Sequence, residues 1–201
     1  MSYLRLNKNH IKKSTDIILK SLGIRTVGAT GLCHDAVVQS ISDLVRESID
    51  SGMSTAVVNG DGDILAQILN AKLYDFHQVA NYHLNLDDPV DNFIHKASNM
   101  SFTSDPMDVL YTYKISSDKS YTKHKYARYL VEKTIEDARE SGFKSIVTDC
   151  TDREYRHVFY GAGFQDKMRS NRATTGVLRN GFSIITDIVH MEKVLTNKIL
   201  S

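Results

Sequence analysis

The spacing of apolar residues changes from segment to segment along the chain, and this spacing predicts the secondary structure. In some segments apolar residues recur every three or four positions, as in helices that bury one face. Such segments begin near Asn9, Val37, Thr122 and Asp152. Runs rich in β-branched and aromatic residues lie between them and predict strands. The predicted strands are Tyr3–Leu6, two runs on either side of "NGDG" at 59–62, and the segments 107–116, 143–150 and 182–195.

Glycines and capping residues set the expected ends of the helices. Asn9 is the expected N-cap of the first helix. The first three helices are expected to end at glycines, namely Gly23, Gly52 and Gly142, because glycine adopts the left-handed conformation that closes many helices. An aspartate followed by a proline also starts an apolar pattern that predicts a helix over residues 88–97.

The order of these elements predicts an α/β domain with a mixed sheet. A strand, a helix and a second strand follow one another between residues 107 and 150, and such a crossover joins parallel strands. The tight turn at "NGDG" instead joins two antiparallel strands. The chain has 201 residues, of which 41% are hydrophobic. This size and composition suit one domain, which we expect to cover residues 1–201.

Charge and composition narrow the possible functions. The 25 basic and 24 acidic residues give a net charge of +1, which provides no general attraction to nucleic acid or to membranes. Cys33 and Cys150 match no metal spacing and fit reduced thiols in an intracellular protein. The first residues lack the apolar segment of a secretion signal, and no apolar run approaches the roughly 20 residues of a membrane helix. We therefore expect a cytoplasmic protein without a metal. We also expect it to be monomeric or homodimeric.

The helix that begins near Thr122 has an unusual first turn, because it carries Lys123, His124 and Lys125. The N-terminus of a helix is the positive end of its dipole, and each cation placed there costs about 0.3–1 kcal/mol. The free backbone N–H groups at such an end also form an anion site. The pattern has two interpretations: three basic side chains that point into water, or a turn that binds a diphosphate.

Two segments near this helix resemble signatures of the GNAT acetyltransferase superfamily. The family's acyl-CoA signature, Arg/Gln-x-x-Gly-x-Gly/Ala, aligns with "TKHKYA" at 122–127, and the expected leucine follows at Leu130. The second signature, an aromatic residue followed after three residues by Gly-Phe, matches "FYGAGF" from Phe159. More loosely, "GDILAQILN" and "FSIITDIVHMEKVL" are similar to the arylalkylamine N-acetyltransferase branch. The chain departs from the first signature at Thr122 and at Lys125, which stands where the family has glycine.

The resemblance implies a GNAT fold: a mixed, mostly antiparallel sheet with helices on both faces. It also implies a split between the strand that contains Ile115 and the strand that ends at Cys150. Acetyl-CoA is the implied co-substrate, with its pyrophosphate on the backbone N–H groups of residues 123–128 and its pantetheine arm in the split. The residues that the resemblance assigns to cofactor binding are Ile115, Ser116, Ser117, Lys123, His124, Lys125, Tyr126, Ala127, Arg128, Asp152, Phe159 and Tyr160.

The same resemblance implies transfer of the acetyl group to a primary amine, small or arylalkyl, by direct attack in a ternary complex. Many family members protonate the departing thiolate with a tyrosine where this chain has Phe159. Tyr155, one turn earlier on the same helix face, is the candidate acid here. The glutamate that the arylalkylamine branch carries after its first helix is missing from residues 23–34, so His34 and His157 are the candidate bases.

Several alternatives stay open at this point. Asp149 and Cys150 border the expected cleft and would orient water or substrate, whereas a nucleophilic cysteine would need a partner base. The aromatic residues that would either stack on an amine or pack in the core are Tyr74, Phe76, Tyr82 and Phe93. An enzyme acting on protein lysines would use an acidic groove, for which residues 87–91 are the candidate. A degenerate, non-catalytic GNAT domain that binds acyl-CoA or a protein partner is the main alternative, favoured by Lys125 and Phe159.

Overall fold

The computed structural model describes residues 1–21, 32–75, 104–117, 123–150, 153–169, 176–177, 183–184 and 189–195, with the backbone alone for 32–37, 123–124, 154, 176–177 and 183–184. Its helices are α1 (Ile11–Ser21), α2 (Leu32–Asp50), α5 (Lys123–Glu140) and α6 (Arg153–Gly161), together with short 3₁₀ turns at Lys8–His10 and Pro106–Asp108. Its strands are β1 (Ser2–Arg5), β2 (Thr55–Val58), β3 (Ile64–Lys72), β4 (Val109–Ser117), β5 (Ser145–Cys150), β6 (Gln165–Arg169), β7 (Gly176–Val177), β8 (Ser183–Ile184) and β9 (Val189–Val194).

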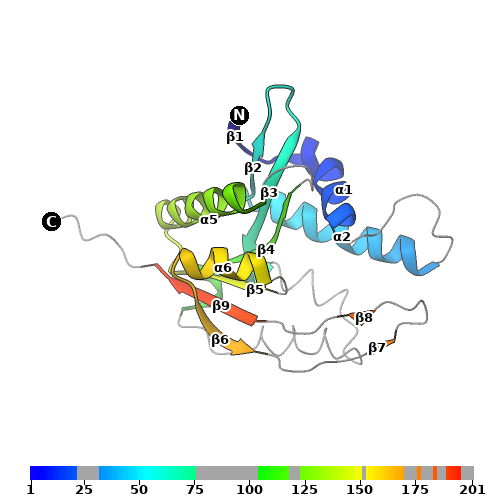
Figure 1. The fold of residues 1–201 in the computed structure, drawn as a ribbon. Coiled ribbons are helices and arrows are strands. Elements are labelled where there is room, and N and C mark those ends of the chain that lie inside the picture. The colour runs from blue at the N-terminus through cyan, green and yellow to red at the C-terminus, as the bar shows by residue number, and fades with distance from the viewer. Residues whose placement is uncertain are drawn as a thin grey trace.

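A seven-stranded sheet in the order β1-β2-β3-β4-β5-β9-β6 forms the centre of the fold (Figure 1). Among the described strands, only β4 and β5 pair in parallel, and α5 is the crossover between them. The other neighbours in this sheet are antiparallel, including the β2–β3 hairpin at "NGDG". The predicted mixed sheet with one parallel crossover is therefore confirmed.

Helices cover both faces of the sheet, as predicted. Ile18 of α1 and Val45 of α2 are buried in one cluster with β2 and β3. Leu130 of α5 is buried in a separate cluster, which also contains Phe159 of α6 and Met191 of β9. Figure 1 shows α5 and α6 together on one side of the sheet and α1 and α2 on the other. The two apolar stripes predicted for α2 and α5 thus pack against opposite faces.

Two predicted element boundaries are wrong. Asn7, not Asn9, is the first cap, because its side-chain oxygen accepts from the backbone N–H of Asn9 at 3.1 Å and starts a 3₁₀ turn before α1. The strand predicted from 107 begins only at Val109, since Asp105 caps a 3₁₀ turn over Pro106–Asp108. Gly52 and Gly142 do close α2 and α5, with φ of +72° and +84°. The helix predicted over 88–97 and the expected stop at Gly23 lie outside the described residues.

The single long strand predicted over 182–195 is also wrong. Within it, β8 pairs with β7 in a separate two-stranded sheet, whereas β9 lies between β5 and β6 in the main sheet. The strand β6, which pairs with β9, was missed because its sequence "QDKMR" is polar and largely exposed. Apolar alternation indicates that a segment is extended, but it does not determine which strand pairs with each part of it.

A buried asparagine ties β4 to α5. The side-chain oxygen of Asn70 on β3 accepts a hydrogen bond from the Thr112 hydroxyl at 2.9 Å. Its amide donates to the backbone carbonyl of Met53 at 2.9 Å and to the Thr134 hydroxyl of α5 at 3.3 Å. Because buried polar groups are costly unless they are paired, this arrangement holds α5 in a defined position against β4.

Candidate active site

β4 and β5 separate halfway along β4. The two strands pair along residues 109–112 of β4 and 145–148 of β5. β4 then continues from Tyr113 to Ser117. Along these five residues, none of the described strands pairs with the edge of β4 that faces β5. Tyr113 is an extra residue in the β3–β4 ladder, where the register shifts. Such a bulge bends a strand and increases its twist, which accounts for the divergence of β4 from β5.

The divergence opens a wedge between the two strands, with about 310 Å³ of empty space that is partly open to solvent. β4, the end of β5 and α6 form its walls through Tyr113, Lys114, Ile115, Thr148, Asp149, Cys150, Tyr155 and Phe159. Among the described residues that line the wedge, the charged ones are Lys114 on β4 and Asp149 on β5. The structure thus brings Ile115, Tyr155 and Phe159 together, three residues that the sequence assigns to the site.

Hydrogen bonds hold Asp149 on the β5 wall. The Tyr111 hydroxyl donates to Oδ2 at 2.9 Å, and His190 Nδ1 lies 2.8 Å from Oδ1. Asp149 and His190 are directly opposite in the β5–β9 ladder, so both side chains lie on the same face of the sheet. Burial, and then the negative charge of Asp149, raise the pKa of Tyr111 well above its usual value. The tyrosine therefore stays protonated and acts as a donor to the carboxylate.

α6 supplies the aromatic wall of the wedge. Tyr155 and Phe159 are one turn apart, and both line the wedge, as their spacing predicts. Tyr155 is half-buried, whereas Phe159 is buried and packs edge-to-face on Phe164 with 4.9 Å between ring centroids. Gly163, with φ of +86°, ends α6 so that Phe164 can turn back onto Phe159. The Gly-Phe signature therefore positions the ring that closes one side of the wedge.

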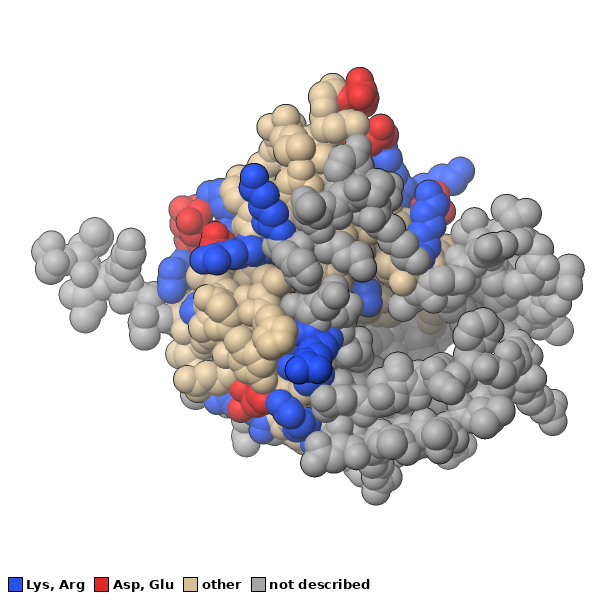
Figure 2. Space-filling view, viewed as in Figure 1, with Lys and Arg blue, Asp and Glu red and all other residues tan. Residues whose placement is uncertain are grey.

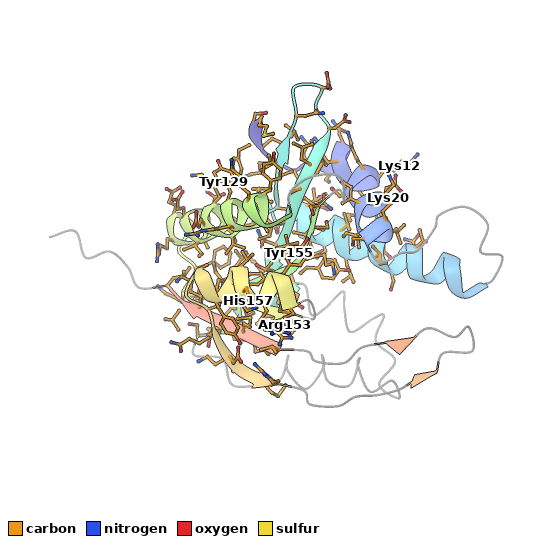
Figure 3. All side chains as sticks on the ribbon, viewed as in Figure 1. Lys12, Lys20, Tyr129, Arg153, Tyr155 and His157 are labelled. Carbon is orange, nitrogen blue, oxygen red and sulfur yellow. The ribbon has the colours of Figure 1, made fainter. Side chains whose placement is uncertain are left out.

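The other predicted catalytic residues are placed differently. His157 is exposed on α6 and is not among the described residues that line the wedge (Figure 3). His34 belongs to α2, but its side chain lies outside the described residues, as does all of Asp152. Tyr160 is exposed, and its hydroxyl donates to Asp166 Oδ1 on β6 at 2.5 Å.

The basic turn begins α5 at Lys123 and contains no acidic residue. Lys125 is exposed and Ala127 is 1% exposed, while Thr122 and the side chains of Lys123 and His124 lie outside the described residues. The neighbouring side chains already have partners within the protein. Tyr126 donates to Met1 Sδ at 3.0 Å, and Arg128 pairs with Glu132 at 2.8 Å. Lys125 and the backbone N–H groups are therefore the parts of this turn best placed to meet an anion.

The end of β4 contains buried hydroxyl groups. Ser116 Oγ accepts from the Gln67 amide at 3.1 Å, and Gln67 also donates to the Ser14 carbonyl of α1 at 3.0 Å. Ser117 is 6% exposed, and its hydroxyl has no hydrogen-bond partner among the described residues. A buried hydroxyl without a partner is unfavourable, so Ser117 is suited to meet a polar group of a ligand.

Sequence reasoning missed Tyr111, Lys114 and His190. Nothing in the sequence distinguishes Tyr111 and Lys114 from the other residues of a buried strand. His190 lies in a segment whose sheet partners were not predicted. Of the predicted aromatic residues, Tyr74 is 48% exposed. Phe76, Tyr82, Phe93 and the acidic residues 87–91 lie outside the described residues.

The described surface carries both signs of charge. Figure 2 shows basic and acidic side chains interspersed over one face rather than one continuous charged region. No helix in the described part of the chain combines the length and apolar character needed to cross a membrane. Among the residues that the structure describes, no group of three or more His, Cys, Asp or Glu side chains could hold a metal ion.

No protein-family model matches the chain. Solved structures nevertheless share its fold over nearly the whole length. Arylalkylamine N-acetyltransferase 2 from Aedes aegypti is 19% identical, with 97% of this chain and 99% of that chain covered and a TM-score of 0.69. The polyamine N-acetyltransferase of Drosophila melanogaster is 12% identical, with 96% and 99% covered and a TM-score of 0.65.

A third similar structure is YncA from Salmonella typhimurium, a candidate acetyltransferase solved with its cofactor acetyl-CoA. It is 11% identical, with 98% of this chain and 95% of that chain covered and a TM-score of 0.58. At these identities the likeness defines the fold alone. The mixed sheet, the parallel pair that separates and the helices on both faces are those of the GNAT fold, and the fold-class prediction is confirmed.

Proposed function

We propose that this protein is an acetyl-CoA-dependent N-acetyltransferase that acts on a primary amine, small or arylalkyl. The observation that carries the proposal is the separation of the parallel strands β4 and β5, which opens a lined wedge in a chain with the GNAT fold. Similar structures named for arylalkylamines and polyamines support the amine as acceptor. We also propose a cytoplasmic location, because Cys33 and Cys150 match no metal spacing and fit reduced thiols in an intracellular protein.

Acetyl-CoA would lie along the end of β4 and reach the start of α5. The β5-side edge of residues 113–117 carries backbone N–H and C=O groups outside the described ladders, and the amides of a pantetheine arm can bond to such an edge as a strand does. Ser117 supplies a buried hydroxyl beside it. The backbone N–H groups at the start of α5, with Lys123 and Lys125, would hold the pyrophosphate.

The reaction needs a neutral amine, whose nitrogen attacks the thioester carbonyl and forms the C–N bond as the C–S bond breaks. In this proposal Tyr155 donates its hydroxyl proton to the departing sulfur, because it lines the wedge from the α6 side. His34 and His157 remain the proposed acceptors of the amine's proton. Since His157 is exposed, it would act through water.

Calorimetric titration of the protein with acetyl-CoA, followed by thiol-release assays with a panel of amines, tests this proposal. We expect micromolar binding and release of CoA that depends on the amine. Failure of the folded protein to bind acetyl-CoA would overturn the proposal. Binding without transfer to any amine would favour the non-catalytic alternative, for which the buried Phe159 in place of a tyrosine is the supporting observation.

A further inference from the structure

We infer that Asp149 binds the ammonium group of the acceptor amine and that Tyr111 and His190 position its carboxylate. This inference rests on the proposed function, and it adds the group that recognises the acceptor. Asp149 lies on the β5 wall of the wedge, opposite the β4 edge proposed to hold acetyl-CoA. A cation bound at Asp149 would therefore lie in the same space as the thioester.

The carboxylate has room for such a ligand. Among the described residues, each of its oxygens has one partner, Tyr111 at Oδ2 and His190 at Oδ1. A carboxylate has about four lone-pair sites, so it can accept further hydrogen bonds. The Asp149 side chain is 11% exposed and lines the wedge, whereas His190 is 3% exposed. The partners therefore hold the carboxylate from the protein side and leave it accessible to the wedge.

The charges on the walls favour one orientation of a cationic acceptor. Asp149 is the one acidic residue among the described residues that line the wedge, and Lys114 is on the β4 wall. An ammonium group is drawn toward Asp149 on β5, while an acceptor with a carboxylate in the same position meets repulsion there. Charge-assisted hydrogen bonds in a partly buried site are stronger than neutral ones. Removal of the ammonium proton before attack remains the task of the proposed base.

The partners of Asp149 act through it rather than on the substrate. Tyr111 is 6% exposed and His190 is 3% exposed, and both project from strands of the central sheet. Rigid strands define the position of a donor more closely than loops do. Loss of either donor would release the carboxylate into other rotamers and weaken ammonium binding without removing the charge.

Asp149→Asn tests the ammonium site in thiol-release assays with tyramine and agmatine as probes. We expect KM for the amine to rise about 10- to 100-fold, as for loss of a hydrogen bond between charged groups, with KM for acetyl-CoA unchanged. Asp137→Asn is the matched control. Asp137 also accepts a hydrogen bond from a tyrosine hydroxyl, that of Tyr3, at 2.9 Å, and its side chain is 12% exposed. It lies on α5 and is not among the described residues that line the wedge. This control should leave both KM values unchanged.

A second measurement needs no variant. Tyrosol has a hydroxyl in place of the ammonium of tyramine. Its inhibition constant against the wild-type protein should be more than tenfold higher than the inhibition constant of tyramine, where tyramine is measured as a competing substrate. In Asp149→Asn this difference should shrink. Equal competition by the two compounds in the wild type would overturn the inference even if the variant failed to fold.

His190 and Tyr111 are tested by rescue. His190→Leu removes the donor and should raise KM for the amine, whereas His190→Asn keeps an N–H near the position of Nδ1 and should restore it. Tyr111→Phe should raise KM for the amine, while Tyr3→Phe, its matched control, should not. If both His190 variants raise KM for the amine equally and also raise KM for acetyl-CoA, the role of His190 is purely structural and the proposed positioning of Asp149 is wrong.

The two proposals fail in different ways. If the wild type acetylates amines and Asp149→Asn keeps its amine KM, the ammonium site is wrong and the proposed function stands. If the wild type neither binds acetyl-CoA nor acetylates an amine, the proposed function fails and the ammonium site fails with it.

Discussion

The hydroxyl of Thr148 on β5 donates a hydrogen bond to the backbone carbonyl of Thr112 on β4 over 3.0 Å. The same two residues form the last parallel pair before the strands separate. Thr148 also lines the wedge and is 3% exposed. The bond therefore fastens the closed end of the wedge, and it affects both the stability of the sheet and the spacing of the two walls.

Thr148→Val keeps the shape of the side chain and removes this bond. We expect the free energy of unfolding to fall by about 1 kcal/mol, the usual net value of a hydrogen bond, and acetyl-CoA to bind several-fold more weakly. Thr15→Val is the control, since Thr15 donates to the Ile11 carbonyl at 2.9 Å on α1 and is similarly buried. It should lose similar stability in denaturant unfolding but keep its acetyl-CoA affinity. Equal affinity in both variants would contradict a role for Thr148 in the wedge.

Charge reversal in the basic turn of α5 should have opposite effects on the stability of the fold and on acetyl-CoA binding. In Lys123→Glu with Lys125→Glu, acidic side chains replace cations at the positive end of the helix dipole. Folding should therefore be unchanged or stabilised, by about 0.3–1 kcal/mol for each replacement. Acetyl-CoA should bind at least tenfold more weakly in calorimetry, because the cations proposed to meet the pyrophosphate become anions.

The control for this charge reversal is Lys12→Glu with Lys20→Glu. Both lysines are exposed on α1, on the other side of the sheet from α5 (Figure 3). This variant changes the net charge of the protein by the same amount, so it should leave acetyl-CoA affinity unchanged. If the Lys123 and Lys125 variant binds as tightly as the wild type, the basic side chains simply point into water.

Gly163→Ala should destabilise the protein more than Gly142→Ala. Both glycines have positive φ, +86° and +84°, so alanine at either costs about 1–2 kcal/mol of backbone strain. A Cβ at 163 would also lie 2.7 Å from Lys193 Nζ, which donates to the Ala162 carbonyl at 2.6 Å. At 142 the same Cβ would meet no described atom within 4 Å. Similar losses of unfolding free energy in the two variants would show that the lysine moves aside at no cost.

Local patterns in the sequence predicted most of the helices and strands that build the wedge. The apolar stripe of α5, the hairpin at "NGDG" and the shared face of Tyr155 and Phe159 each depend on residues within a few positions of one another, where spacing is informative. The parallel crossover followed from the order of strand, helix and strand. Local sequence patterns were therefore sufficient to predict these helices, this hairpin and this crossover.

Contacts between distant segments were not predictable in this way. His190 meets Asp149 across 41 residues, only because β9 is inserted between β5 and β6. The pairing partner of a strand depends on the whole sheet, and the alternation within 182–195 carries no information about it. The bulge at Tyr113 likewise leaves no clear signal in a strand of β-branched and aromatic residues. Thus the walls of the wedge were expected, while the partners of Asp149 were not.

Glu47→Gln should stabilise the protein at neutral pH. Burial, and then the charges of Asp75 and Asp50, raise the pKa of Glu47 in the folded state. The native state therefore holds this proton more tightly than the unfolded state, so stability falls as pH rises from the ordinary range of a carboxyl through the raised pKa. Since the side chain is only partly buried and solvent screens its charge, we expect a gain of only about 0.2–0.5 kcal/mol at pH 7 and low salt.

Denaturant unfolding at pH 7 and pH 3 checks this prediction. The gain should disappear at pH 3, where the wild-type carboxyl is protonated and resembles the amide. Glu132→Gln is the control of opposite sign, because Glu132 pairs with Arg128 on α5 and its loss should not stabilise the protein. A gain in Glu47→Gln that persists at pH 3 would point to a cause other than charge.

Tyr155→Phe tests the proposed proton donor to the departing thiolate. The variant keeps the ring that packs against the core and lines the wedge, and it removes only the hydroxyl. We expect kcat to fall by about 100-fold, within the range that general acids contribute. The acetyl-CoA dissociation constant should stay within about twofold of the wild-type value, because the cofactor is proposed to bind through β4 and α5.

Tyr129→Phe is the matched control for this variant. Tyr129 is 42% exposed on α5 and is not among the residues that line the wedge, so removing its hydroxyl should change neither kcat nor affinity. Stopped-flow measurement of a single turnover separates the chemical step from product release, since a lost proton donor slows the chemical step itself. If Tyr155→Phe keeps the wild-type single-turnover rate, water protonates the thiolate and Tyr155 serves only to pack α6 against the wedge.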